Sequence, residues 1–144
     1  MVLLSIDEVR EYVSDYAPNN YLIDGEEFTD TYISLCISLA IDAFNSLTPR
    51  SNYNEATFPS KSILLLGTCW QMFQGKAALL ARNTMQYSDG GLQVPIEERS
   101  ELYNGIAGNF RGQFREQAQP LKIQMNMESG WGEIRSDESR FLMW

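Results

Sequence analysis

The sequence predicts a mainly α-helical protein: a four-helix bundle-like domain with long helices, followed by an extended C-terminal arm with a short β-hairpin or strand. Apolar residues recur every three or four positions through most of the 144 residues. Capping, proline and glycine signals bracket these stretches. After Pro120 the period changes to strict alternation. We therefore expect a helical domain over residues 1–119 and the arm over residues 120–144.

The first helix is expected to begin after Ser5, because Ser5-Ile6-Asp7-Glu8 has the form of a capping box. Pro18-Asn19-Asn20 should end it. Its apolar face consists of residues spaced three or four positions apart, namely Ile6, Val9, Val13 and Tyr16.

A second helix is predicted from about Glu26 to Leu47, ended by Thr48-Pro49. It is apolar over much of its circumference, which indicates a central helix or one that is buried on two sides. The expected stripe is Tyr32, Leu35, Cys36, Leu39, Ala43 and Leu47, widened by Ile33, Ile37, Ile41 and Phe44.

The third helix is predicted from about Ser60 to Tyr87, before the turn residues Ser88-Asp89-Gly90-Gly91. At that length it would span about 40 Å, so it should either kink near Gly75 or project beyond the core. One side is lined by Ile63, Leu66, Trp70, Phe73, Ala77, Leu80 and Ala81.

Pro95 should open a fourth helix and Pro120 should close it. Its expected core contacts are Leu102, Ile106, Phe110 and Phe114. The helix also contains three glycines, each of which costs about 1 kcal/mol relative to alanine. Either another backbone approaches closely there or the helix is locally flexible; the glycines are Gly105, Gly108 and Gly112.

Beyond Pro120 the alternation predicts a strand, with Leu121, Ile123, Met125 and Met127 on one face. Gly130-Trp131-Gly132 would form a turn or bulge, and Glu133-Ile134-Arg135 a short returning strand. The chain then ends on the apolar run Phe141-Leu142-Met143-Trp144.

The sequence contains no histidine. The commonest general base and the commonest zinc ligand are therefore missing, and Ser-His-Asp and Cys-His arrangements are excluded. Glu97, Glu98 and Glu101 are explained by their position in a first helical turn, where acids favour the helix dipole. Cys36 and Cys69 fit buried free thiols. We expect no enzyme activity, no cofactor and no metal site.

The net charge is −8, and residues 1–60 carry all of it, because residues 61–144 sum to zero. An acidic surface disfavours sequence-independent DNA binding. The charge serves either solubility or a surface that faces nucleic acid without gripping it. No signal peptide and no membrane-spanning run are seen, so we expect a soluble protein.

The C-terminal arm is the candidate interaction site, because large apolar side chains at a terminus would form an aggregation-prone patch if left exposed. Either the arm folds back on its own core or it inserts into a partner. Arg111 and Arg115 are a second candidate, as a subunit contact, a solvated face or a phosphate contact. The predicted arm contacts are Trp131, Ile134, Arg135, Arg140, Phe141, Leu142, Met143 and Trp144.

The helix layout over residues 5–119, the break Tyr87-Ser88-Asp89-Gly90-Gly91 and the arm Leu121–Trp144 resemble the head-to-tail connector (adaptor, or head-completion) proteins of tailed bacteriophages. These are small acidic helical proteins with long helices and an extended tail. The resemblance covers nearly the whole chain.

The resemblance implies a ring of subunits, commonly twelve, beneath the portal of the capsid. The ring would extend the DNA channel and dock the next neck or tail protein, with the arm from Gly130 to Trp144 reaching into the portal. DNA would pass through without specific binding. The location would be the neck of the virion, after assembly in the host cytoplasm. The family carries no invariant catalytic residue.

Two other classes of function remain open from the sequence. A small helical nucleic-acid-binding or DNA-packaging regulator would use Arg111 and Arg115 and would bind DNA in a salt-dependent way. An enzyme would need a concave site with convergent carboxylates. Within the structural class, another tail or baseplate subunit is the alternative.

Overall fold

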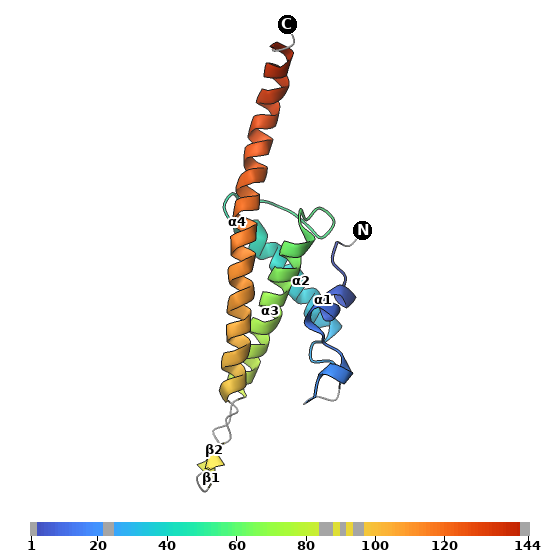
Figure 1. The fold of residues 1–144 in the computed structure, drawn as a ribbon, viewed down its shortest axis with the longest axis vertical. Coiled ribbons are helices and arrows are strands. Elements are labelled where there is room, and N and C mark those ends of the chain that lie inside the picture. The colour runs from blue at the N-terminus through green and yellow to red at the C-terminus, as the bar shows by residue number, and fades with distance from the viewer. Residues whose placement is uncertain (1–2, 22–24, 84–87, 90–91, 94–96, 142–144) are drawn as a thin grey trace.

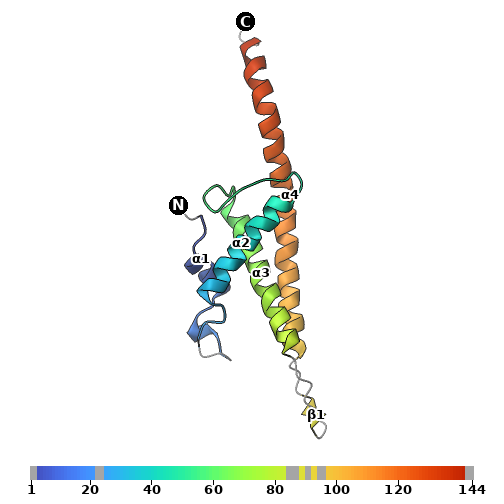
Figure 2. The same cartoon turned by 180° about the vertical axis from the view of Figure 1, so that it is seen from behind.

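The computed structural model describes residues 3–21, 25–83, 88–89, 92–93 and 97–141; for residues 88–89, 92–93, 97–98 and 131–141 it describes the backbone alone. The protein is mainly helical, as the sequence predicts (Figure 1). Within the described residues the helices α1 to α3 and the first part of α4 form a bundle. The rest of α4 continues past this bundle (Figures 1 and 2).

Helix α1 spans Ile6–Val13, and its predicted capping box is confirmed. The Ser5 hydroxyl accepts from the Glu8 backbone N–H at 3.2 Å, and the Glu8 carboxylate accepts from the Ser5 backbone N–H at 2.9 Å. Ser14 ends the helix in a left-handed conformation with φ 54°. A short 3₁₀ helix, η1, follows at Ala17–Asn19.

Helix α2 spans Asp30–Ser46, four residues later at its start than predicted, because Thr29 is the residue whose side chain caps it. Helix α3 spans Lys61–Arg82 with Ser60 as its N-cap. It runs unbroken through Gly75 and ends before the predicted Tyr87.

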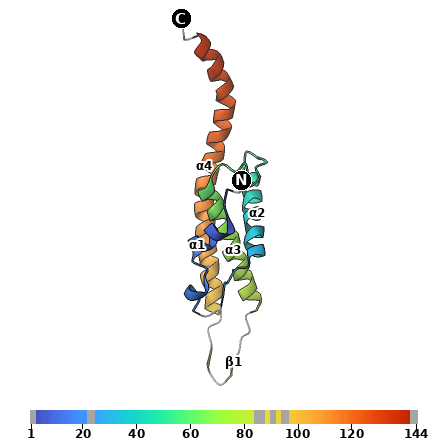
Figure 3. The same cartoon turned by 90° about the vertical axis from the view of Figure 1, so that its right-hand side faces the viewer.

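Helix α3 is the centre of the bundle, with α4 along one side and α2 along another, while α1 packs on α2 and α3 (Figures 2 and 3). Gly67 marks the crossing, since an added Cβ would lie 2.9 Å from the Phe114 ring and 3.0 Å from the Ala40 Cβ. The largest fully buried apolar side chains are Leu4, Val9, Ile33, Cys36, Phe44, Leu64, Cys69, Met72 and Phe114.

Two residues that were expected in the core, Leu35 and Leu39, are exposed on α2. The buried side is shifted toward the second stripe, with Ile33, Ile37 and Phe44 in the core together with Cys36 of the first stripe. Both stripes fit a helical period, so the sequence alone did not decide where the centre of the buried side lies.

Between α3 and α4, two short strands, β1 (Ser88–Asp89) and β2 (Leu92–Gln93), pair antiparallel. They lie at the end of the molecule opposite to the projecting part of α4 (Figure 1). The predicted opening residue Pro95 lies outside the described residues.

Helix α4 spans Glu97–Phe141, and this overturns three predictions. Pro120 does not close the helix but lies inside it, on the exposed side, where water can bond the carbonyl that the missing N–H leaves free. The predicted strand at Leu121–Met127 is helical. The turn at Gly130-Trp131-Gly132 and the returning strand at Glu133-Ile134-Arg135 are helical as well.

The alternation after Pro120 misled the strand prediction because it also fits a helix with apolar residues on two faces. Leu121 and Met125 are four positions apart on the side that meets the bundle, and both are half-buried. Ile123 and Met127 are four positions apart on the opposite, exposed side. The residues between them, rich in Lys, Gln and Glu, are good helix formers.

The boundary between a domain over residues 1–119 and an arm over residues 120–144 stays a prediction. Helix α4 passes through that point without interruption.

Candidate interaction surface

The inner side of α4 attaches it to the bundle through aromatic contacts. The Phe114 ring is buried and lies 5.7 Å from the Trp70 ring, and the Phe110 ring stacks 5.8 Å from Phe73. Near the start of the helix the Tyr103 hydroxyl donates to the Glu27 carboxylate at 2.7 Å. These contacts leave the other side of α4 free of the bundle.

Lys122 fixes α4 to the C-terminal end of α2. Its side chain is buried, and its Nζ donates to the carbonyl oxygens of Phe44 at 2.6 Å and Leu47 at 2.7 Å. A third bond reaches Asn45 O at 3.3 Å, and Nζ lies 4.9 Å from the centre of the Phe44 ring. A cation at this position favours the helix dipole. Burial lowers the pKa of the Lys122 ammonium.

Past Met125 the helix leaves the bundle. Residues 126–130 are all exposed, and the backbone continues as helix to Phe141 (Figures 1 and 3). The whole of α4 is about 68 Å long at 1.5 Å per residue. Its last part therefore forms a helical projection, defined here as residues 126–141.

The predicted arm contacts lie on this projection or beyond it. The backbone of Trp131, Ile134, Arg135, Arg140 and Phe141 is helical, so the arm is not extended over these positions. Their side chains lie outside the described part, as do the residues Leu142, Met143 and Trp144. The backbone through residue 141 runs away from the bundle and does not fold back on it (Figure 2).

The structure places the side chains of Arg111 and Arg115 in different environments. The Arg111 guanidinium lies 5.6 Å from the centre of the Trp70 ring, which is a cation–π contact within the chain. Arg115 is exposed, and no hydrogen bond or ion pair holds it among the described residues. Of the two, Arg115 is available to another chain.

The exposed side of α4 carries a surface that the sequence analysis missed. We call it the outer face; only Glu116 on it is charged. Leu102 and Ile106 were expected in the core and are exposed instead. The signal was present in the sequence, because Gly105 and Ile123 each lie nine positions from Phe114, on the opposite side of the helix, and neither is charged. The outer face consists of Leu102, Gly105, Ile106, Asn109, Gly112, Gln113, Glu116, Pro120, Ile123 and Met127.

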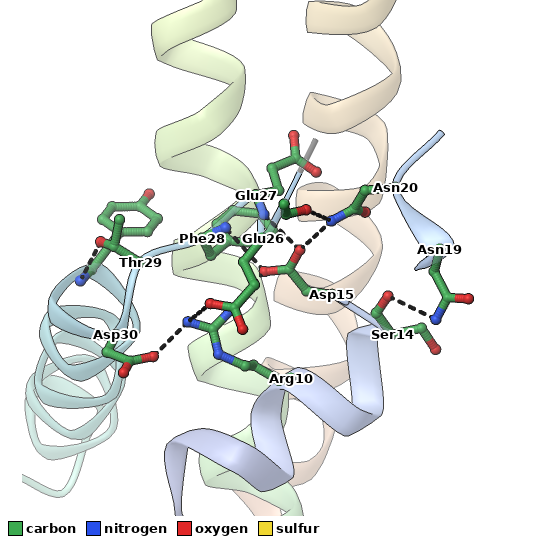
Figure 4. A network of polar contacts seen from close by, with 12 residues as sticks. Arg10, Ser14, Asp15, Asn19, Asn20, Glu26, Glu27, Phe28, Thr29 and Asp30 are labelled. Carbon is green, nitrogen blue, oxygen red and sulfur yellow. Dashed lines mark hydrogen bonds and ion pairs between the residues drawn. The ribbon is translucent and has the colours of Figure 1, made fainter. Parts of the chain in front are cut away.

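Figure 4 shows a network of polar contacts around Arg10 and Asp15, in which these side chains bond to other groups of the chain. Arg10 is buried and pairs with Asp15 at 3.0 Å, Glu26 at 3.1 Å and Asp30 at 2.5 Å. Asp15 also accepts from the backbone N–H of Glu27 at 2.7 Å. The network connects α1 to the start of α2, and its single cation, Arg10, is shared by three carboxylates.

Two hollows lie at the surface of the described part of the chain. One of about 300 Å³ lies beside Lys122, Arg50 and Tyr53, and one of about 340 Å³ lies beside Tyr32, Gly75 and Lys76. Within the described residues no group of three or more Cys, Asp or Glu side chains could hold a metal ion. Nor is any described helix both long and apolar enough to cross a membrane.

Comparison with known proteins found no family model, no curated protein and no solved structure that matches the chain.

Proposed function

We propose that the chain is a structural assembly protein that binds a partner through the C-terminal part of α4. The observation that carries this proposal is the helical projection at residues 126–141, which continues beyond the last contact of α4 with the bundle. A helix of this length that stands away from a bundle is marginal in water, more so with Gly130 and Gly132 in it. A partner that packs against the projection would supply the missing stabilisation.

The specific role that we propose is that of a head-to-tail connector in a tailed bacteriophage. The likeness in sequence layout supports it, together with a long helix that ends away from the bundle. In this role, copies of the chain form a ring, commonly of twelve, under the portal. The projection inserts into the portal, the bundle docks the next neck or tail protein, and DNA passes through the channel.

The charge distribution fits this role. The excess acid lies in residues 1–60, and four of these acids, Asp7, Glu11, Asp42 and Glu55, have no cation beside them among the described residues. A surface of that sign repels DNA phosphates and would let DNA slide. The proposed role needs neither catalysis nor a cofactor, and the protein would reside in the neck of the virion.

The test is co-sedimentation of the chain with the portal protein of the virus that encodes it. Deleting Gly130–Trp144 should abolish binding while the circular dichroism signal of the bundle persists, because the backbone of α4 runs away from the bundle in this part (Figure 2). Tyr21→Asp is the control, since Tyr21 is an exposed aromatic side chain far from α4 in the sequence and should leave binding unchanged. Binding that survives the deletion would rule out insertion of the projection.

A further inference from the structure

The outer face of α4 has its apolar residues in two pairs. Leu102 and Ile106 form one pair, 66% and 39% exposed, and Ile123 and Met127 form the other, 47% and 54% exposed. Each pair is spaced by four positions and so lies on one side of the helix. Between the pairs the face is polar or small, and only Glu116 is charged there.

The two pairs are placed symmetrically about one point. The midpoint between Leu102 and Met127 falls between Phe114 and Arg115, and the midpoint between Ile106 and Ile123 falls at the same place. A second α4 laid antiparallel over that point would set Leu102 against Met127 and Ile106 against Ile123. By symmetry, each of these contacts would occur twice.

We propose that the partner of the outer face is a second copy of this chain, packed antiparallel, α4 against α4, about the point between residues 114 and 115. This proposal goes beyond the connector role and does not depend on it. The paired helices would overlap over residues 97–132 of each copy, a length of about 54 Å.

The glycines of α4 support close packing of a second helix. An added Cβ at Gly105 or Gly112 would meet nothing within 4 Å in the chain itself, so neither glycine is required by the bundle. Glycine in a helix interior costs about 1 kcal/mol relative to alanine. Close approach of another backbone, one of the two explanations raised by the sequence, would offset that cost.

The polar groups at the centre are complementary in this arrangement. Glu116 has no ion-pair partner among the described residues. In the antiparallel register Glu116 of one copy lies opposite Gln113 of the other, because these two positions share the same midpoint. Two hydrogen bonds, each donated by the Gln113 amide to the Glu116 carboxylate, would then form between the copies.

The antiparallel pair is closed, because each copy uses the same surface, and it cannot grow into a ring. This contact is therefore limited to two copies. The overlap leaves residues 133–141 of each α4 beyond the end of the other helix, so that this part of the projection stays accessible to another protein.

Engineered disulfides test the register. In the variant Ile106→Cys/Ile123→Cys, mild air oxidation should convert most of the chain into a covalent dimer on a non-reducing gel. Neither single variant should do so, because residue 106 of one copy lies about 25 Å from residue 106 of the other. Self-linking of Ile106→Cys alone would mean a parallel pair and would overturn the proposal. The native Cys36 and Cys69 are buried and should remain reduced.

Analytical ultracentrifugation tests the surface independently. The wild-type chain should sediment as a dimer at micromolar concentration, and Ile106→Glu should raise the dissociation constant about 100-fold, since each of two equivalent contacts contributes about tenfold. Asn104→Glu adds the same charge to α4 away from the outer face and should change it less than threefold. A wild-type monomer at 100 µM, or equal effects of the two variants, would overturn the proposal.

Discussion

The hydroxyl group of Tyr32 lies directly over Gly75, where α2 meets α3. It donates to the carbonyl oxygens of Met72 at 3.1 Å and Gln71 at 3.4 Å. A Cβ added at Gly75 would collide with the hydroxyl oxygen. The glycine is therefore required by a contact with a residue 43 positions earlier in the chain, not by a turn or a kink of α3.

This relationship predicts a strong coupling between the two positions. Gly75→Ala should lower the free energy of unfolding by about 1–3 kcal/mol, because the tyrosine must move and lose its hydrogen bonds. In a Tyr32→Phe background the same change should cost less than half as much, since the oxygen is gone and alanine favours the helix. Urea unfolding of the four proteins of this double-mutant cycle measures the coupling. Equal costs in both backgrounds would contradict it.

Lys122 should contribute more to stability than any exposed lysine. Lys122→Met removes the ammonium that donates to the carbonyl oxygens of Phe44, Asn45 and Leu47, so we expect a loss of about 1–3 kcal/mol in the free energy of unfolding. Lys61→Met is the matched control, because Lys61 pairs with Glu8 at the surface and should leave the denaturation midpoint unchanged within measurement error. A similar loss in both variants would mean that the carbonyl bonds contribute nothing.

Stability should fall as the pH rises above about 9. Burial raises the pKa of the Cys36 thiol to about 11. Burial is also the main cause that raises the pKa of the Cys69 thiol to about 12. In the unfolded chain these thiols ionise near pH 9. Between pH 9 and 11 the unfolded state therefore binds fewer protons than the folded state, and each thiol lowers stability by about 1.4 kcal/mol per pH unit.

Two other groups modify this alkaline decline. Burial is the main cause that raises the pKa of Tyr32 to about 12, which adds to the loss above pH 10. Lys122 acts in the opposite direction, because its lowered pKa means that the folded state loses a proton before the unfolded state does. Urea midpoints from pH 8 to 11 for the wild type and for Cys36→Ala/Cys69→Ala measure the thiol contribution. An unchanged slope in the double variant would disprove it.

Alanine at the open glycines of α4 should separate helix propensity from packing between copies. Gly105→Ala and Gly108→Ala both fit the chain without contact, so each should raise the free energy of unfolding of the isolated subunit by up to about 1 kcal/mol. Only Gly105 belongs to the outer face. Sedimentation at dilutions around the dissociation constant should show weaker dimers for Gly105→Ala and unchanged dimers for Gly108→Ala. The reverse order would place the contact on another side of α4.

The positions of the helices could be predicted because their signals are local. Ser5 and Ser60 act through hydrogen bonds to residues three positions away, so the sequence identifies the starts of α1 and α3 directly. The candidate site was predicted only in part. The sequence drew attention to the C-terminal segment, but it missed the outer face of α4 and the buried position of Lys122.

Those features depend on contacts between distant parts of the chain. The alternation at Leu121, Ile123, Met125 and Met127 satisfies both a strand and a two-faced helix. It is the packing of α4 on the bundle, with Lys122 bonded to carbonyl oxygens at least 75 positions earlier, that selects the helix.

The sequence by itself determined that the chain is helical, where α1 and α3 begin, and that histidine chemistry is excluded, because propensity, capping and composition are properties of neighbouring residues. Only the tertiary structure decided which apolar faces are buried and which are left open. Burial is a property of the partner surface: Ile33 and Phe114 meet α3, while Leu35 and Leu102, with equally apolar side chains, have no neighbour to cover them.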